Sequence, residues 1–207
     1  MPRARLSTRR LLGLDRSGPP PPQTAPDAPL HPWTIPNAIG YFRAALIPLI
    51  LIFAYSSRSG TVPGVGICFW LAGAGDYADG IAARITGQYS RLGALLDPVV
   101  DRLLAVSGLA ICWSYELLPR WLVVLVVARE LLMLVLGQAW VRRGLPLRIN
   151  WPGRIAVGPT LVGIWLALLG VRAVGEAFIL VGIALALVAT GYYLRDGVRE
   201  LRRAGAA

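Results

Sequence analysis

Cysteine is scarce in this sequence, and its scarcity argues against two kinds of protein. The 207 residues include two cysteines, Cys68 and Cys112, and both lie inside apolar runs. A disulfide framework needs more cysteines and a zinc site needs clustered ligands, so neither fits. We expect both cysteines to be small, buried hydrophobic side chains.

Lysine is absent: all 21 basic residues are arginine, and the formal net charge is +10. A chain this basic could bind nucleic acid. Its arginines flank apolar segments, however, which favours membrane lipids with anionic headgroups as partners and no nucleic acid. Hydrophobic residues make up 56% of the chain and charged residues only 15%. A soluble domain of this size could not bury so many apolar residues, so the long apolar runs are predicted to be membrane spans.

Six apolar segments follow residue 34, each about long enough to cross the ~30 Å hydrocarbon core of a bilayer. They cover approximately residues 39–55, 62–83, 92–115, 121–141, 155–171 and 177–194. The predicted fold class is therefore an all-α integral membrane protein with six transmembrane helices. Residues 1–33 are predicted to be a disordered, basic and proline-rich cytoplasmic tail with a short interfacial helix in its arginine-rich part. Residues 34–199 would form the six-helix domain, and residues 200–207 a short cytoplasmic tail.

Arginine is distributed unevenly between the two ends of these segments. Fifteen arginines lie in the two tails and in the second-to-third and fourth-to-fifth loops, whereas the opposite ends carry three, Arg58, Arg120 and Arg172. An even number of spans puts both termini on one side, and the positive-inside rule makes that side cytoplasmic. The sequence predicts a multi-pass protein of the cytoplasmic membrane with both termini in the cytoplasm.

Four aspartates interrupt two of the most apolar parts of the chain, within residues 75–102. Asp76 and Asp79 are three residues apart and Asp97 and Asp101 four apart, so each pair shares one face of its helix. The short loop between the pairs makes the two helices antiparallel neighbours, whose acids can face each other at the cytoplasmic end. Carboxylates inside a spanning segment are costly and indicate a functional site.

Four carboxylates in a medium of low dielectric constant repel one another unless cations neutralise them. Hard divalent ions with oxygen ligands, Mg²⁺ or Mn²⁺, suit them best. Two such ions make a site for a diphosphate and for in-line displacement at phosphorus. The small side chains of Gly80 and Ala83 would let a ligand approach the backbone, and Arg84 would pair with a phosphate.

The stretch DYADGIAARITGQYSRLGALLDPVVD resembles the signature of the CDP-alcohol phosphatidyltransferase family, D-x2-D-G-x2-A-R-x8-G-x3-D-x3-D. Its eight fixed positions are filled without a gap by Asp76, Asp79, Gly80, Ala83, Arg84, Gly93, Asp97 and Asp101. The stretches TIPNAIGYFR and ARE are similar to parts of the first and fourth spans in the phosphatidylglycerophosphate synthase branch. The resemblance covers the chain from residue 34 onward and excludes the tail.

The resemblance implies a six-helix membrane enzyme, a homodimer, with a site for two metal ions open to the cytoplasm. It also implies a CDP-linked lipid donor, CDP-diacylglycerol, and loss of CMP. By motif position, Asp76, Asp79 and Asp97 would be metal ligands. Asp101 would approach the second metal and act as general base on the acceptor hydroxyl.

The CDP-lipid site implied by the resemblance involves Gly80, Ala83, Arg84, Ser90 and Gly93. Of these, Gly80 and Arg84 would contact the CDP part, and Ser90 would lie near the diphosphate.

The acceptor alcohol is indicated less clearly. Arg43 in the first segment and Arg129 in the fourth can hold the phosphate of glycerol 3-phosphate, although Arg129 with Glu130 could equally lock helix packing. The synthase branch commonly has lysines after the glycine that begins the fifth segment, but here Arg154 alone follows Gly153. We therefore expect a small phosphorylated alcohol, with glycerol 3-phosphate first. Phosphatidylglycerol, as in cardiolipin synthases, and a polyol phosphate stay open as alternatives.

Two further classes also place acids in membrane helices. A cation transporter would have them near mid-membrane and show repeat symmetry, whereas these acids cluster at one end and residues 39–115 do not resemble residues 121–194. A catalytically inactive lipid-binding scaffold would not need the complete eight-position motif.

Overall fold

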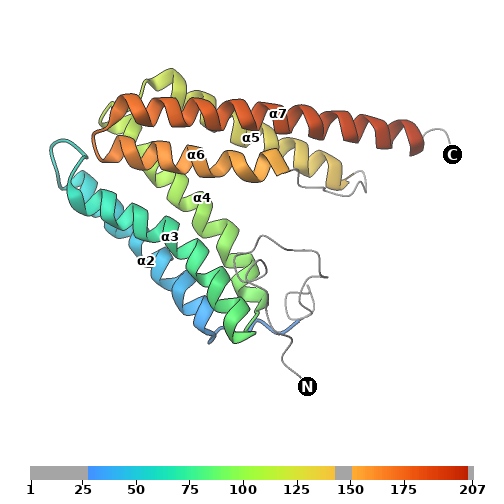
Figure 1. The fold of residues 1–207 in the computed structure, drawn as a ribbon, viewed down its shortest axis with the longest axis horizontal. Coiled ribbons are helices and arrows are strands. Elements are labelled where there is room, and N and C mark those ends of the chain that lie inside the picture. The colour runs from blue at the N-terminus through green and yellow to red at the C-terminus, as the bar shows by residue number, and fades with distance from the viewer. Residues whose placement is uncertain (1–27, 143–150, 205–207) are drawn as a thin grey trace. The chain divides into compact units, whose positions relative to one another are not determined.

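The computed structural model describes residues 28–142 and 151–204, and every regular element in these ranges is a helix. The helices are α2 (Ile35–Tyr55), α3 (Pro63–Thr86), α4 (Arg91–Ser114), α5 (Arg120–Arg142), α6 (Trp151–Leu168) and α7 (Arg172–Ala204) (Figure 1). Each of the six predicted segments coincides with one helix, which confirms the all-α fold class. The basic stretch with its predicted interfacial helix lies outside the described residues.

The chain divides into two compact units. The first unit holds α2, α3 and α4 as far as Ser107, and the second holds the rest of α4 together with α5, α6 and α7. Cys68 in the first unit and Cys112 in the second are buried free thiols, as predicted. The four aspartates all belong to the first unit.

Two helical stretches, Ile35–Tyr55 and Arg172–Tyr192, are long and apolar enough to cross a membrane, and Ala156–Leu168 is a shorter apolar helix. Large apolar side chains are exposed on all six helices, for example Ile52, Ile67, Val106, Leu131, Val157 and Val181. Extensive apolar exposure of this kind marks an interaction surface, here one suited to lipid. The helices α3 and α4 carry the charged motif, which lowers their apolar content.

Local signals explain how the first unit begins and turns. Thr34 caps α2 by accepting a hydrogen bond from the backbone N–H of Asn37 at 3.3 Å, and a proline occupies the first turn. Helix α3 ends at Thr86, before Gly87 with φ +67°. A left-handed backbone at this point favours glycine and lets the chain reverse within four residues into α4. The reversal brings the acidic ends of α3 and α4 to the same end of the unit.

The second unit is built around the pair α6 and α7, whose backbones approach closely at glycines. A Cβ atom added at Gly163 would lie 2.7 Å from the carbonyl oxygen of Gly175, and one at Gly182 would lie 3.0 Å from the backbone nitrogen of Thr160. Such small-residue contacts are typical of helix packing in membranes.

Helix α7 runs to Ala204, ten residues past the predicted end of the sixth segment at Leu194. Its polar extension contains no proline and is rich in arginine, which favours helix. Most of the short tail predicted at residues 200–207 is therefore a continuation of the helix.

Candidate active site

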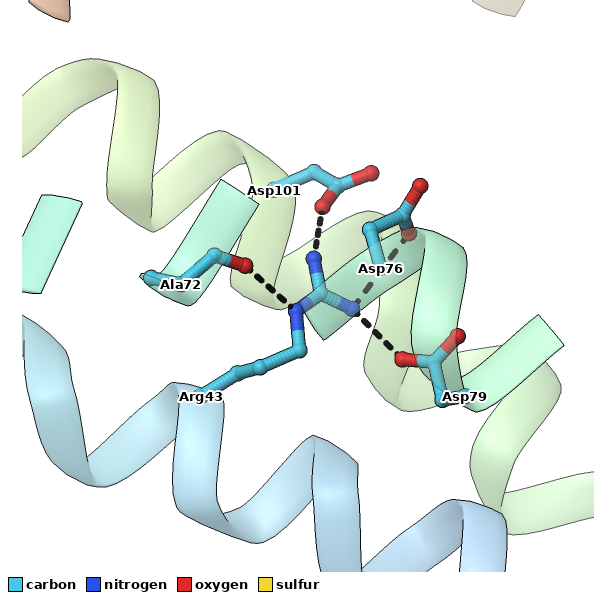
Figure 2. A network of polar contacts seen from close by, with 5 residues as sticks. All are labelled: Arg43, Ala72, Asp76, Asp79 and Asp101. Atoms are coloured by element: carbon cyan, nitrogen blue, oxygen red, sulfur yellow. Dashed lines mark hydrogen bonds and ion pairs between the residues drawn. The ribbon is translucent and has the colours of Figure 1, made fainter. Parts of the chain in front are cut away.

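Three of the four motif aspartates converge on one arginine of the first unit (Figure 2). The Nη1 atom of Arg43, from α2, lies 2.8 Å from Oδ2 of Asp79 and 3.3 Å from Oδ1 of Asp76, both on α3. Its Nη2 atom donates to Asp101 on α4, and its Nε atom donates to the carbonyl oxygen of Ala72 at 2.9 Å. One guanidinium thus ties three helices together.

Burial is graded across this cluster. The side chain of Arg43 is fully buried and that of Asp79 is 7% exposed, whereas those of Asp101 and Asp76 are 38% and 50% exposed. A buried guanidinium is tolerated only when its donors are paired, and its planar fork of five N–H groups suits several carboxylates at once. The cluster therefore has a closed side at Asp79 and an open side at Asp76 and Asp101.

The donor chemistry of the cluster fits a hard divalent cation, because carboxylate oxygens are the ligands that Mg²⁺ and Mn²⁺ prefer. If Asp76, Asp79 and Asp101 are ionised, Arg43 leaves the cluster with a formal excess of two negative charges. As the side chains stand, no three acids, histidines or cysteines among the described residues converge to hold a metal ion. Arg43 lies between the carboxylates of Asp76, Asp79 and Asp101.

The predicted CDP-lipid residues separate into two environments. The atoms nearest to a Cβ built at Gly80 belong to the guanidinium of Arg84, the first at 3.4 Å, which is an ordinary van der Waals contact. The backbone at Gly80 is therefore approachable, as a role in ligand binding requires. Contact of Gly80, Ala83 and Arg84 with CDP stays a prediction.

Ser90 and Gly93 instead form part of a packed junction between α2 and α4. The hydroxyl of Ser90 donates to Oδ1 of Asn37 at 2.8 Å and accepts the backbone N–H of Gly93 at 2.9 Å, which caps α4. A Cβ atom at Gly93 would lie 2.7 Å from Oδ1 of Asn37. Gly93 leaves room for the buried Asn37–Ser90 bond, a structural role that the sequence did not reveal.

The same junction fastens residues 28–33 to the start of α4. The amide nitrogen of Asn37 donates to the carbonyl oxygens of His31 and Pro32 at 2.9 and 3.1 Å, and the N–H of Leu92 donates to Leu30 at 3.3 Å. The described end of the predicted tail is thus anchored by hydrogen bonds. Asn37, which sequence reasoning missed, belongs to the TIPN stretch at the start of the first span.

Gly80 lies in open surroundings and Gly93 in the packed junction with Asn37, so alanine at these two motif glycines should have opposite effects. Gly93→Ala should lower the melting temperature, because overpacking of this kind costs about 1–3 kcal/mol. Gly80→Ala should leave the melting temperature unchanged or slightly higher, since alanine favours helix, but should weaken binding of CDP-diacylglycerol. Tryptophan-fluorescence melting and ligand binding in detergent micelles measure both effects. Equal melting shifts for the two variants would contradict the packing role of Gly93.

The predicted acceptor residues lie in both units. Arg43 belongs to the cluster, whereas Arg129 on α5 forms an ion pair with Glu130, and its Nε atom is buried without a hydrogen-bond partner in the described part of the chain. Arg154 lies on α6, with its side chain outside the described residues. Acceptor binding by these three arginines stays a prediction.

Membrane-length helices and a carboxylate cluster shared by α3 and α4 define a helical membrane protein with an acidic polar site. A model of the CDP-alcohol phosphatidyltransferase family matches residues 33–189, a range that includes all eight motif positions. The chain belongs to this family.

Individual relatives fall into two groups. A Mycobacterium tuberculosis protein named as a candidate cardiolipin synthase is 37% identical over 139 residues, 66% of this chain and 65% of that protein. A Streptomyces coelicolor cardiolipin synthase (CMP-forming) is 38% identical over 127 residues, 59% of each chain. A Shigella flexneri CDP-diacylglycerol–glycerol-3-phosphate 3-phosphatidyltransferase is 28% identical over 179 residues, 82% of this chain and 97% of the relative. The chain therefore spans less than two thirds of the length of the first two relatives.

Proposed function

We propose that the protein transfers a phosphatidyl group from CDP-diacylglycerol to an alcohol and releases CMP. The observation that carries this proposal is the family match over residues 33–189, with every fixed motif position occupied. The convergence of Asp76, Asp79 and Asp101 in one cluster supports it, since the reaction needs a group that accepts a proton close to groups that bind the diphosphate.

The proposed acceptor is phosphatidylglycerol, which would make the product cardiolipin. Identity to the cardiolipin synthases is 37–38%, against 28% for the glycerol-3-phosphate enzyme. The single basic residue after Gly153 also favours phosphatidylglycerol, because binding a small phosphorylated acceptor would need more positive charge there. Glycerol 3-phosphate, the first expectation from the sequence, is the second candidate, and the 97% coverage of its Shigella relative favours it.

The proposed reaction uses Mg²⁺ or Mn²⁺, two ions, with Asp76, Asp79 and Asp97 as the residues that would hold them. Such ions would neutralise the diphosphate and polarise its phosphorus. The oxygen of the acceptor hydroxyl attacks the phosphorus that carries diacylglycerol, and Asp101 takes the proton of that hydroxyl. The bond from that phosphorus to the bridging oxygen breaks, and CMP leaves with the electron pair. In the described arrangement Asp101 is paired with Arg43, so it acts as a base only after this contact opens.

The membrane setting belongs to the proposal as well. The excess of arginine around the acidic end of the spans supports a cytoplasmic site in the cytoplasmic membrane. The exposed apolar faces of the helices would contact lipid, and a homodimer is the assembly that the family resemblance implies.

Release of CMP tests the proposal directly. Purified full-length protein in nanodiscs should release CMP from CDP-diacylglycerol with Mg²⁺ or Mn²⁺ and phosphatidylglycerol, and not after treatment with EDTA. Parallel reactions with glycerol 3-phosphate and with inositol phosphate discriminate between the acceptors. Release with glycerol 3-phosphate alone would make the second candidate the function, and no release with any acceptor would refute the transferase proposal.

A further inference from the structure

Arg43 occupies the place among the carboxylates where the proposed reaction needs metal ions. It is the largest fully buried side chain of the described residues, and all three of its nitrogen atoms are engaged. An arginine this deep in a membrane-length helix is costly unless partners balance its charge. Here three carboxylates from two other helices supply that balance.

Guanidinium and metal compete for the same oxygen atoms. Oδ2 of Asp79 and Oδ1 of Asp76 lie 2.8 and 3.3 Å from Nη1, and Asp101 accepts from Nη2. A divalent ion held by Asp76 and Asp79 would need their oxygens within about 2.0–2.6 Å of its own centre, where no guanidinium can remain between them. No group of three such ligands is assembled among the described side chains in this arrangement.

The stem of Arg43 packs closely against helix α3. Its Cγ and Cδ atoms pass over Gly75, where an added Cβ would come within 2.7 and 2.8 Å. This contact confines the stem, so the remaining freedom lies in the terminal torsions that turn the guanidinium. The half-exposed carboxylates of Asp76 and Asp101 give an incoming ion access from the open side of the cluster.

We propose that Arg43 is a resident counter-cation of the aspartate cluster, which a divalent metal ion must displace in order to bind. The inference rests on the metal dependence of the proposed function. Without metal, the guanidinium holds α2, α3 and α4 together and offsets part of the negative charge of the carboxylates. Metal binding releases the fork, and the same step frees Asp101 to accept a proton.

Mn²⁺ binding to the full-length protein in nanodiscs, followed by the electron paramagnetic resonance of the free ion, tests this exchange. Arg43→Gln removes the competing charge. If the closed arrangement holds roughly nine tenths of the wild-type molecules, the variant should bind Mn²⁺ about tenfold more tightly. Its metal-free melting temperature should fall, and Mn²⁺ should raise that temperature by more than in the wild type. Arg120→Gln removes an equal charge from an exposed pair with Glu116 and should change neither quantity.

The outcomes separate this inference from the proposed function. Equal or weaker Mn²⁺ binding by Arg43→Gln would overturn the exchange while leaving the metal requirement intact. No Mn²⁺ binding by either protein would refute the proposed metal site itself, and the exchange with it.

A second variant tests whether Arg43→Gln lowers the melting temperature through lost charge balance or through lost packing. In Arg43→Gln with Asp101→Asn, one negative charge leaves together with the positive one, so the metal-free melting temperature should recover part of its loss. A double variant that melts no higher than Arg43→Gln would show that Arg43 acts through packing, which overturns its role as counter-cation.

Discussion

Asparagine at position 101 is expected to slow CMP release by roughly 10²–10⁴-fold, the usual contribution of a general base. Asp101 is the motif acid on α4 that contacts Arg43, and its side chain is partly exposed toward the open side of the cluster. The amide cannot take the proton of the acceptor hydroxyl. Its carbonyl oxygen can still accept from Arg43, so the fold should be retained. Steady-state CMP release with saturating phosphatidylglycerol measures the effect.

Binding of CDP-diacylglycerol separates the two roles considered for Asp101. Asp101→Asn should bind the donor about as tightly as the wild type, which equilibrium binding in nanodiscs can measure. The matched control is Glu116→Gln, which also converts a carboxylate to an amide, but in an exposed pair with Arg120. This control should keep full activity. A large loss of donor binding in Asp101→Asn would identify Asp101 as chiefly a metal ligand.

Valine at Gly75 is expected to destabilise the metal-free protein by about 3–5 kcal/mol, the cost of breaking a buried ion pair by displacing one partner. The added Cβ would lie 2.7 Å from Cγ of Arg43, so the stem must shift. We expect this shift to draw the guanidinium away from its carboxylates. Unfolding by SDS in mixed micelles, followed by tryptophan fluorescence, gives the free energy. CMP release should fall in parallel.

Gly73 provides the control for this substitution. It lies two residues away on α3, and a Cβ added there meets nothing within 4 Å. Valine at either position carries the same helix-propensity penalty from its branched side chain. The difference between Gly75→Val and Gly73→Val therefore isolates the contact with Arg43. Similar losses in both variants would mean that this contact does not hold the cluster together.

The helices and the acidic motif were predictable because both depend on local spacing. Apolar runs of membrane length become helices wherever they lie, and acids three or four residues apart share a helix face by geometry. The roles of individual residues were less accessible. Arg43 meets Asp79 and Asp101 across 36 and 58 residues of sequence, and no local pattern specifies which polar group a buried arginine will find.

The contacts of Ser90 and Gly93 were also not predictable from the sequence. Motif position assigns them to the CDP-lipid site, yet their contacts with Asn37 depend on how α2 packs against the start of α4. The motif contains residues for ligand binding and residues for helix packing, but the sequence does not tell which residue has which role. A Cβ test at each glycine does separate them, because open space and a tight contact predict opposite effects of alanine.

The burial of Arg43 also has a consequence for how the protein is made. Helix α2 leaves the ribosome before the carboxylates of α3 and α4 exist, so its arginine enters the membrane without its native partners. An unpartnered arginine at the centre of a spanning helix costs about 2.5–3.5 kcal/mol during insertion. That penalty is offset only when Asp79 and Asp101 arrive, 36 and 58 residues later. We therefore expect the first helix to become fully stable in the bilayer only after the next two helices have been made.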